Sequence, residues 1–217
     1  MPRKLITEQS VVDAAKRGET SISVGDDTIV TAAAKDRAAS MGIRIGRKGG
    51  KQDSSGIPAA PLAAGGKGET IALGSDHGGF QMKQQLKSSL ESSGFNVVDV
   101  GTYSEEACDY PDFAYAVARL VSMGEASRGI MIDSVGIASA IVANKVAGIR
   151  AACCTDEFMA RSSREHNNAN ILTLGGKTLG IETAKGILKK WLETPFGGGR
   201  HQKRIEKITD IENRSKS

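Results

Sequence analysis

The chain has 217 residues, of which 39% are hydrophobic and 25% charged, the composition of an ordinary globular protein. No apolar run approaches the roughly 20 residues that a membrane span needs, and the N-terminus lacks the apolar core of a secretion signal. We therefore expect a cytoplasmic protein without membrane contacts. Its three cysteines form neither a CxxC pair nor an even set, which favours a reducing compartment and speaks against a disulfide scaffold or a metal site.

The formal net charge of +4 raises the question of nucleic-acid binding, and the distribution of charge answers it. Two short stretches, 46–68 and 200–217, each carry a net charge of +3, whereas the segment 69–199 carries 12 basic and 15 acidic residues. Because this pattern leaves no broad basic face, we expect no nucleic-acid partner. The two basic stretches need separate explanations.

Residues 1–45 predict a small α+β module. Thr7 and Thr31 each precede a helical pattern and are typical N-cap residues, and a glycine closes each helix. The expected elements are a helix over 8–18, a strand over 20–25, a helix over 32–42 and a strand over 43–45. The module contains no histidine or cysteine, and we expect no catalytic group in it.

A flexible linker is expected over 46–68. Seven of its residues are glycine, two are proline, and no periodic apolar pattern runs through it. The linker separates the N-terminal module from a larger C-terminal domain over 69–217.

The C-terminal domain alternates strand and helix patterns. Strands are expected over 70–75, 96–101, 129–133, 149–154 and 170–175. Helices are expected over 79–93, 111–123, 137–146, 156–166, 180–194 and 200–214. This order is typical of an α/β fold with a five-stranded parallel sheet and helices on both faces. Ligands of such folds bind beyond the carboxyl ends of the strands.

Polar residues follow two of the predicted strands. Asp76 and His77 come after the first strand, and Asp133 comes after the third, in the loop DSVGIAS (133–139). Small residues in this loop allow exposed backbone amides at a helix N-terminus, which is an anion-binding arrangement. The alternative is a tight strand-to-helix turn without a ligand.

Two further segments carry reactive groups. His166 and Asn167 precede the fifth strand, whereas Arg200 and Arg204 are four residues apart and share one face of the last helix. Two arginines on one face suit a phosphate group. The alternatives are a structural histidine, and arginines that are solvated or paired with acidic residues of their own helix.

Five ordered segments of the C-terminal domain resemble the family of type B ribose-5-phosphate isomerases and galactose-6-phosphate isomerase subunits. They are GSDHGGF (74–80), DYPDFA (109–114), GIASAIVANKVAGIRAA (136–152), SREHNNANILTLGG (163–176) and FGGGRHQKR (196–204). The resemblance implies a Rossmann-like five-stranded sheet, a homodimer or tetramer, a phosphorylated sugar as substrate, and neither metal nor cofactor. It also implies active sites at a subunit interface, with residues from both chains.

The same resemblance implies roles for single residues. Asp76 and His77 handle the sugar hydroxyls and the phosphate. His166 opens the sugar ring, with Asn167 beside it. The other implied substrate contacts are Tyr110, Lys177, Arg200 and Arg204. The two arginines meet the phosphate, and the lysine stands where the family has a further phosphate-binding arginine.

The loop after the third strand departs from the family pattern. Family members carry Cys-Gly-Thr-Gly-Ile-Gly, with the cysteine as base for the C2 proton, or a glutamate base at the place of Ser139. This chain has Asp133 and Val135 in place of the cysteine and the threonine. We expect Asp133 to act as the base, with its pKa raised by burial, beside Asp76 and His166 as catalytic residues. The expected oxyanion donors are the loop amides of Ser134, Gly136 and Ala138.

Three functions follow from these features. The first is an aldose–ketose isomerase that converts ribose 5-phosphate to ribulose 5-phosphate through an enediolate. The second is a sugar-phosphate-binding or scaffold protein whose catalysis is lost or altered, because the family's cysteine is Asp133. The third is an isomerase of another sugar phosphate, such as a hexose 6-phosphate.

Residues 1–45 also resemble N-terminal segments of ethanolamine-utilisation proteins and other enzymes of bacterial microcompartments. Such extensions recruit enzymes to a shell. The resemblance therefore implies shell or cargo proteins as partners, and a place inside a microcompartment. The alternatives are a generic small domain and an oligomerisation device.

Overall fold

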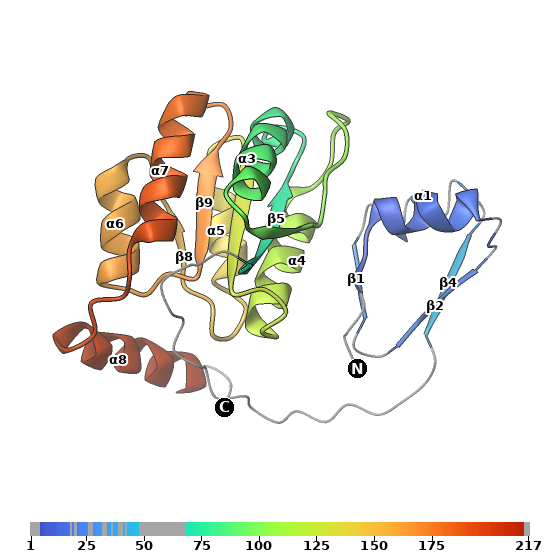
Figure 1. The fold of residues 1–217 in the computed structure, drawn as a ribbon. Helices are drawn as coiled ribbons and strands as arrows, with labels where there is room; N and C mark the ends of the chain where they lie inside the picture. The colour runs from blue at the N-terminus through green and yellow to red at the C-terminus, as the bar shows by residue number, and fades with distance from the viewer. Residues whose placement is uncertain are drawn as a thin grey trace.

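The computed structural model describes residues 5–17, 19, 21–25, 28–31, 34–35, 37–38, 41, 43–47 and 68–214. The linker expected over 46–68 lies almost entirely outside these residues, and so does part of the helix expected over 32–42. Figure 1 shows the described residues as a small N-terminal unit and a larger C-terminal domain.

A five-stranded sheet forms the centre of the C-terminal domain. Its strands are β5 (Thr70–Ser75), β6 (Asn96–Asp99), β7 (Arg128–Asp133), β8 (Ala151–Cys153) and β9 (Ile171–Gly175). They lie in the order β6-β5-β7-β9-β8, and every neighbouring pair is parallel. The predicted Rossmann-like α/β fold is confirmed.

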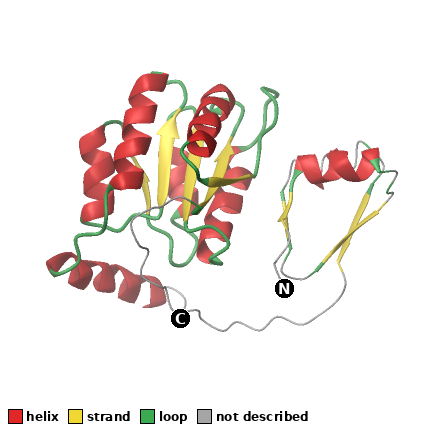
Figure 2. Cartoon of the chain, viewed as in Figure 1, coloured by secondary structure: helices red, strands yellow, loops and turns green. Residues whose placement is uncertain are grey.

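Helices cover both faces of this sheet (Figures 1 and 2). They are α3 (Phe80–Ser92), α4 (Tyr110–Ser122), α5 (Ile137–Ala143), α6 (Glu157–Glu165) and α7 (Ile181–Glu193). Leu86 of α3 and Trp191 of α7 share one buried cluster with Ile71 of β5. Phe113 of α4 shares the other cluster with Ala72. Because Ile71 and Ala72 are adjacent in a strand, their side chains point to opposite faces.

The strand register brings three strand ends level with one another. Ser75 of β5 pairs with Ile132 of β7, and Asp133 of β7 pairs with Gly175 of β9. We call the edge of the sheet at which β5, β7 and β9 end the carboxyl edge, which is uppermost in Figure 1, and the opposite edge the amino edge. The loops that follow these strands therefore meet at the carboxyl edge.

The last helix, α8 (Arg200–Arg214), lies below α6 and α7 in Figures 1 and 2, on the side of the amino edge. Gly198 and Gly199 precede it with φ angles of +59° and +54°, a conformation that other residues rarely adopt. The side chains of His201 and Ile205 are buried and hold the helix against the domain.

The N-terminal unit has a small core of its own. Its elements are β1 (Leu5–Ile6), α1 (Glu8–Lys16), β2 (Ser21–Val24), β3 (Ile29–Val30) and β4 (Arg44–Arg47). Strand β1 pairs with β3 and β2 with β4, both in parallel. The predicted N-caps form, since Thr7 Oγ1 accepts from Ser10 N at 3.3 Å and Thr31 Oγ1 from Ala34 N at 3.1 Å. The buried core consists of Ile6, Val11, Ala14, Ile22, Val24, Ala34, Ala38 and Ile43.

Candidate active site

Three loops pack against one another at the carboxyl edge. They span residues 76–79 after β5, 134–136 after β7 and 176–178 after β9. Gly176 lies against the first loop, since a Cβ on it would come within 2.7 Å of Gly78 O. A Cβ on Gly78 would in turn collide with the Ser134 hydroxyl. Glycine is therefore needed at position 176, where the neighbouring atom is backbone, whereas a Cβ at position 78 would displace the Ser134 hydroxyl.

Asp133 is buried in this packing and accepts four hydrogen bonds. Its Oδ1 accepts from the backbone N–H of Val135 at 2.7 Å and from that of Gly136. Its Oδ2 accepts from the backbone N–H of Ser139 at 3.0 Å and from the Ser139 hydroxyl. The turn needs glycine at position 136, where φ is +89°. The carboxylate thus binds the amides around the start of α5.

The pKa of Asp133 is lowered, not raised. Burial by itself raises it, but the hydrogen bonds from Ser139, Gly136 and Val135 together outweigh burial. The expectation of a raised pKa is therefore wrong, because the loop supplies donors to the ionised carboxylate. The Gly136 amide, which we expected to hold the enediolate, already donates to Asp133.

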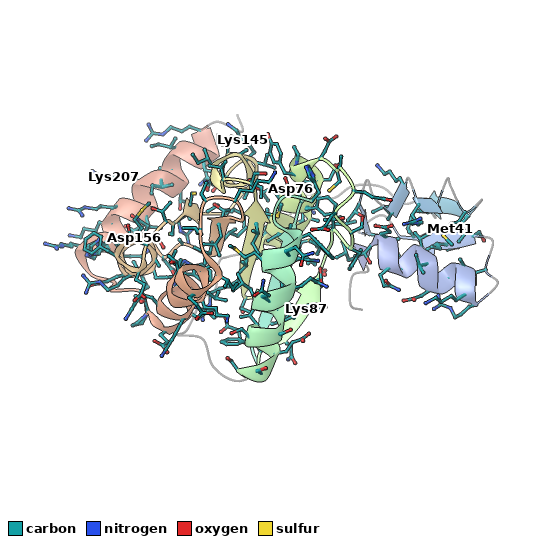
Figure 3. All side chains as sticks on the ribbon, turned by 90° about the horizontal axis from the view of Figure 1, so that it is seen from above. Met41, Asp76, Lys87, Lys145, Asp156 and Lys207 are labelled. Carbon is teal, nitrogen blue, oxygen red and sulfur yellow. The ribbon has the colours of Figure 1, made fainter. Side chains whose placement is uncertain are left out.

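Asp76 is the second buried carboxylate of the carboxyl edge and is labelled in Figure 3, which looks down on that edge. Its Oδ1 accepts from the backbone N–H of Gly79 at 3.0 Å, and its own N–H donates to Ile132 O at 3.1 Å. Burial raises the pKa of Asp76, and the negative charge of Asp133 adds to the effect. The pKa values of the two neighbouring carboxylates are therefore shifted in opposite directions.

His77 contacts the segment that leads into α4. Its Nδ1 lies 3.2 Å from Cys108 O, 3.3 Å from Cys108 N and 4.0 Å from Cys108 Sγ. Burial raises the pKa of the Cys108 thiol. Tyr110 opens α4 two residues later. The sequence reasoning missed Cys108 as a neighbour of the site, although its place just before Tyr110 was a signal for it.

Lys177 is held at the same edge by its backbone. Its N–H donates to Ser134 O at 3.0 Å, and its side chain is exposed. The carboxyl edge therefore gathers eight of the predicted site residues, namely Asp76, His77, Tyr110, Asp133, Ser134, Gly136, Ala138 and Lys177. The missed Ser139, buried below Asp133, completes this set.

The remaining predicted residues lie at the amino edge. His166 follows α6, and its ring stacks on that of His201 in α8, with centroids 4.4 Å apart. His166 Nδ1 also lies 3.2 Å from the Ser162 hydroxyl. Burial lowers the pKa of His201, and the nearby His166 ring acts in the same direction. His201 thus joins His166 and the exposed side chains of Arg200 and Arg204, a grouping that the sequence did not predict.

The two groups lie at opposite edges of the sheet within one chain (Figure 1). Helix α6 starts beyond the end of β8 and runs back along the sheet, so the residues at its end reach the amino edge. The rule that ligands bind at strand carboxyl ends applies to Asp76 and Asp133, but not to His166, which precedes the amino end of β9. A single chain therefore does not assemble all predicted site residues.

The part of the chain that the structure describes offers neither a metal site nor a membrane-spanning helix. There, no three His, Cys, Asp or Glu side chains gather as a metal site requires. No helix among these residues has the length and apolar character to cross a membrane.

Comparison with known proteins identifies the family to which the chain belongs. Residues 71–208 match the family model described as Ribose/Galactose Isomerase. The chain belongs to this isomerase family. Ribose-5-phosphate isomerase B of Escherichia coli is 46% identical over 144 residues, which are 66% of this chain and 97% of the relative. D-erythrulose-4-phosphate isomerase of Pectobacterium atrosepticum is 38% identical over 151 residues, 68% of this chain and 97% of the relative.

Solved structures of the ribose/galactose isomerase family share the fold. Ribose-5-phosphate isomerase B of Clostridium thermocellum matches with a TM-score of 0.67 and 49% identity, over 67% of this chain and 99% of that one. The enzyme of Mycoplasma genitalium with bound ribulose-5-phosphate matches with a TM-score of 0.65 and 37% identity, over 68% of this chain and 99% of that one. This chain is a sugar-phosphate isomerase of the aldose–ketose kind.

Proposed function

We propose that this isomerase converts ribose 5-phosphate to ribulose 5-phosphate through an enediolate, in a site shared by two subunits. The observation that carries the proposal is the pair of buried carboxylates, Asp76 and Asp133, with His77 beside them at the carboxyl edge. Proton transfer next to a carbonyl uses carboxylates whose proton affinities differ in this way. The pentose phosphate is the substrate named for the E. coli relative.

In this proposal the residues of the amino edge bind the phosphate and open the ring. Arg200 and Arg204 are one helical turn apart and exposed, so both guanidinium groups are available to a phosphate. His166 donates a proton to the ring oxygen as the sugar opens, and Asn167 lies beside it. At the carboxyl edge, Lys177 and Tyr110 meet the substrate from the other side.

A second copy of the chain brings the two edges together in this proposal. Exposed apolar side chains flank both edges, which is the surface that an interface between subunits covers. Val135, Ile137 and Ile141 are exposed at and beyond the start of α5, beside Asp133. On α8, Ile208 and Ile211 are exposed, in the same helix as the arginines. Contacts through these surfaces would place α8 of one subunit over the carboxyl edge of the other.

The reaction is tested with a panel of aldose phosphates incubated with the full-length protein. Ribose 5-phosphate is expected to yield ribulose 5-phosphate, detected by chromatography. If only a tetrose or hexose phosphate is turned over, that sugar phosphate is the substrate in place of the pentose, and the proposed type of reaction stands. If ribitol 5-phosphate binds but no aldose phosphate reacts, the protein is a sugar-phosphate-binding protein and the proposed reaction is wrong.

The shared site is tested by mixing two inactive variants, Asp76→Asn and His166→Ala. After subunit exchange, half of the sites in a mixed dimer combine an intact carboxyl edge with an intact amino edge. The mixture should therefore regain about a quarter of the wild-type activity, while each variant alone stays inactive. A mixture no more active than either variant alone would contradict a site that combines the carboxyl edge of one subunit with the amino edge of the other.

We also propose that residues 1–45 form a recruitment module that carries the isomerase to a bacterial microcompartment. The separate core of the N-terminal unit supports a module with its own surface, and the C-terminal domain accounts for the whole family match, residues 71–208. In this proposal the enzyme works inside the shell, with shell or cargo proteins as partners.

A further inference from the structure

We propose that Asp76 accepts the C2 proton in this isomerase, and that Asp133, at the position of the family's base, is a positioning residue that holds the loop after β7. This inference rests on the proposed isomerase function and deepens it. Three observations carry it: the bonding of Asp133, the bonding of Asp76, and the closeness of the two.

Both oxygens of Asp133 are already committed to its own loop. Oδ1 accepts from two backbone amides, and Oδ2 accepts from the amide and the hydroxyl of Ser139. A carboxylate that takes a proton from carbon must turn one lone pair to the substrate and give up at least one of these donors. These hydrogen bonds are charge-assisted, and protonation of Asp133 would weaken them. Asp133 is therefore built to remain ionised.

Asp76 is bonded differently. Among the described residues, the hydrogen bonds that its carboxylate accepts come from backbone amides of the following turn, at Gly79 and Gly78. Asp76 also lies close to the loop after β7. A Cβ on Gly78 would lie 3.3 Å from Asp76 Oδ1 and would at the same time collide with the Ser134 hydroxyl of that loop. Asp76 thus lies beside the loop that the family uses for catalysis, with fewer donors to lose.

The electrostatics of the pair agree with this division. Burial raises the pKa of Asp76, and the fixed negative charge of Asp133 strengthens its hold on a proton. A carboxylate with a raised pKa is the stronger base once ionised, whereas one stabilised by four donors is weaker. His77 faces Asp76 with the opposing effect, and Cys108 lies against His77. Burial raises the pKa of the Cys108 thiol, which disfavours the thiolate that a cysteine base requires.

The proton transfers balance without any co-reactant. Ionised Asp76 takes the proton from C2 of the open aldose, the C2–H electron pair forms the C1=C2 bond, and the carbonyl pair moves to O1. The proton of O2 then passes to O1, the O2 pair forms C2=O, and the C1=C2 pair takes the proton back from Asp76 at C1. The ketose leaves and Asp76 is ionised again.

The experiment compares Asp76→Asn with the matched variant Asp133→Asn in the full-length protein. Asp76→Asn should lower kcat for ribose 5-phosphate by about 10³-fold or more, while its loss of affinity for ribitol 5-phosphate stays far smaller than its loss of kcat. Asp133→Asn should lower kcat by about 10-fold. The acidic limb of its profile of kcat against pH should also move to lower pH, because Asp76 loses a negative neighbour and its pKa falls. The proposal fails if Asp133→Asn loses as much as Asp76→Asn, or if its pH profile does not move.

A titration separates this assignment from the proposed function. In the NMR spectrum of protein with ¹³C-labelled aspartate carboxyls, the signal that Asp76→Asn lacks belongs to Asp76, and the signal that Asp133→Asn lacks belongs to Asp133. The Asp76 signal should titrate at a higher pH than the Asp133 signal, whether or not the protein turns over a sugar. The reverse order would overturn the assignment, even in an active enzyme. Inactivity of the wild type on every aldose phosphate would instead overturn the isomerase function, and the order of the two signals would still test the roles of Asp76 and Asp133.

Discussion

Lys83 is a fully buried lysine that ties α3 to the loop after β6. Its Nζ lies 2.6 Å from Asp99 Oδ1 and donates to Thr102 O at 2.7 Å. Burial lowers the pKa of Lys83, and the charge of Asp99 opposes the shift. Because the loop leads to Cys108 and Tyr110, this ion pair supports the segment that flanks His77.

Asp99→Asn is expected to lower the free energy of unfolding by about 3–5 kcal/mol, because the buried ammonium loses its charged partner. Urea denaturation monitored by circular dichroism measures the loss. Lys87→Ala is the matched control, since Lys87 is the more exposed partner of the same carboxylate, and it should cost at most about 1 kcal/mol. Equal losses for both variants would contradict the importance of the buried contact.

Ser139→Ala removes one charge-assisted hydrogen bond from Asp133 and is expected to cost about 1–3 kcal/mol at neutral pH. Since the pKa of Asp133 is lowered in the folded state, its contribution is complete above the ordinary value of 3.8 and is lost as the pH falls through the folded pKa. The difference in melting temperature between variant and wild type should therefore become smaller as the pH is lowered. A difference that does not change with pH would show that Ser139 stabilises the fold by packing and not through the Asp133 carboxylate.

Helix α8 is attached on one side and open on the other. His201 and Ile205 are buried against the domain, whereas Ile208 and Ile211 are 47% and 63% exposed. The Glu212 carboxylate also accepts from Gly148 N at 2.8 Å, which fastens the far end of the helix. The helix is thus held by its own chain, yet it keeps an apolar stripe that another subunit can cover.

The double variant Ile208→Ser, Ile211→Ser is expected to weaken subunit association, because each exposed isoleucine loses apolar surface that an interface would bury. Analytical ultracentrifugation should show a shift toward monomer, with activity lost in parallel. Lys207→Ser, on the same helix, is the control and should leave the sedimentation coefficient unchanged. An unchanged oligomer in the double variant would place the interface elsewhere.

At the scale of the whole chain, the predicted site residues and the N-terminal unit lie in different parts of the sequence. The C-terminal domain carries all of the predicted site residues and the match to the isomerase family, while the N-terminal unit buries its own eight-residue core. Leu5 of the N-terminal unit packs against the apolar cluster that contains Phe113. The side chain of Thr7 also forms a hydrogen bond with Tyr103 of the domain. These contacts are a small part of the packing of the domain, so the domain is expected to fold without the N-terminal unit.

Deletion of residues 1–68 should leave isomerase turnover and the melting temperature close to those of the full chain, because the larger clusters lie within the C-terminal domain. The same deletion should abolish co-purification with microcompartment shells if residues 1–45 recruit the enzyme. Turnover assays, thermal melts and shell fractionation measure these three effects. A truncated chain that aggregates would make the N-terminal unit structural, and continued shell association would refute the recruitment role.

Apolar periodicity and capping residues are enough to predict the five strands of the C-terminal domain, the helices between them and a parallel sheet, but not the order of its strands. These signals are local, because a strand or helix buries one face at a repeat of two or about 3.6 residues. The residues at the ends of β5 and β7 could be placed for the same reason. The loop after β7 could be recognised as different from its family, and Asp133 could be named as the difference.

Two properties of the site depended on contacts between elements distant in the sequence. The backward course of α6 puts His166 at the amino edge, away from Asp76 and Asp133, and no local sequence pattern reports on that distance. The pKa of Asp133 falls because backbone amides and Ser139 converge on it after a left-handed turn at Gly136. Composition and spacing named the ionisable groups, but hydrogen bonding and burial in the folded chain set their proton affinities.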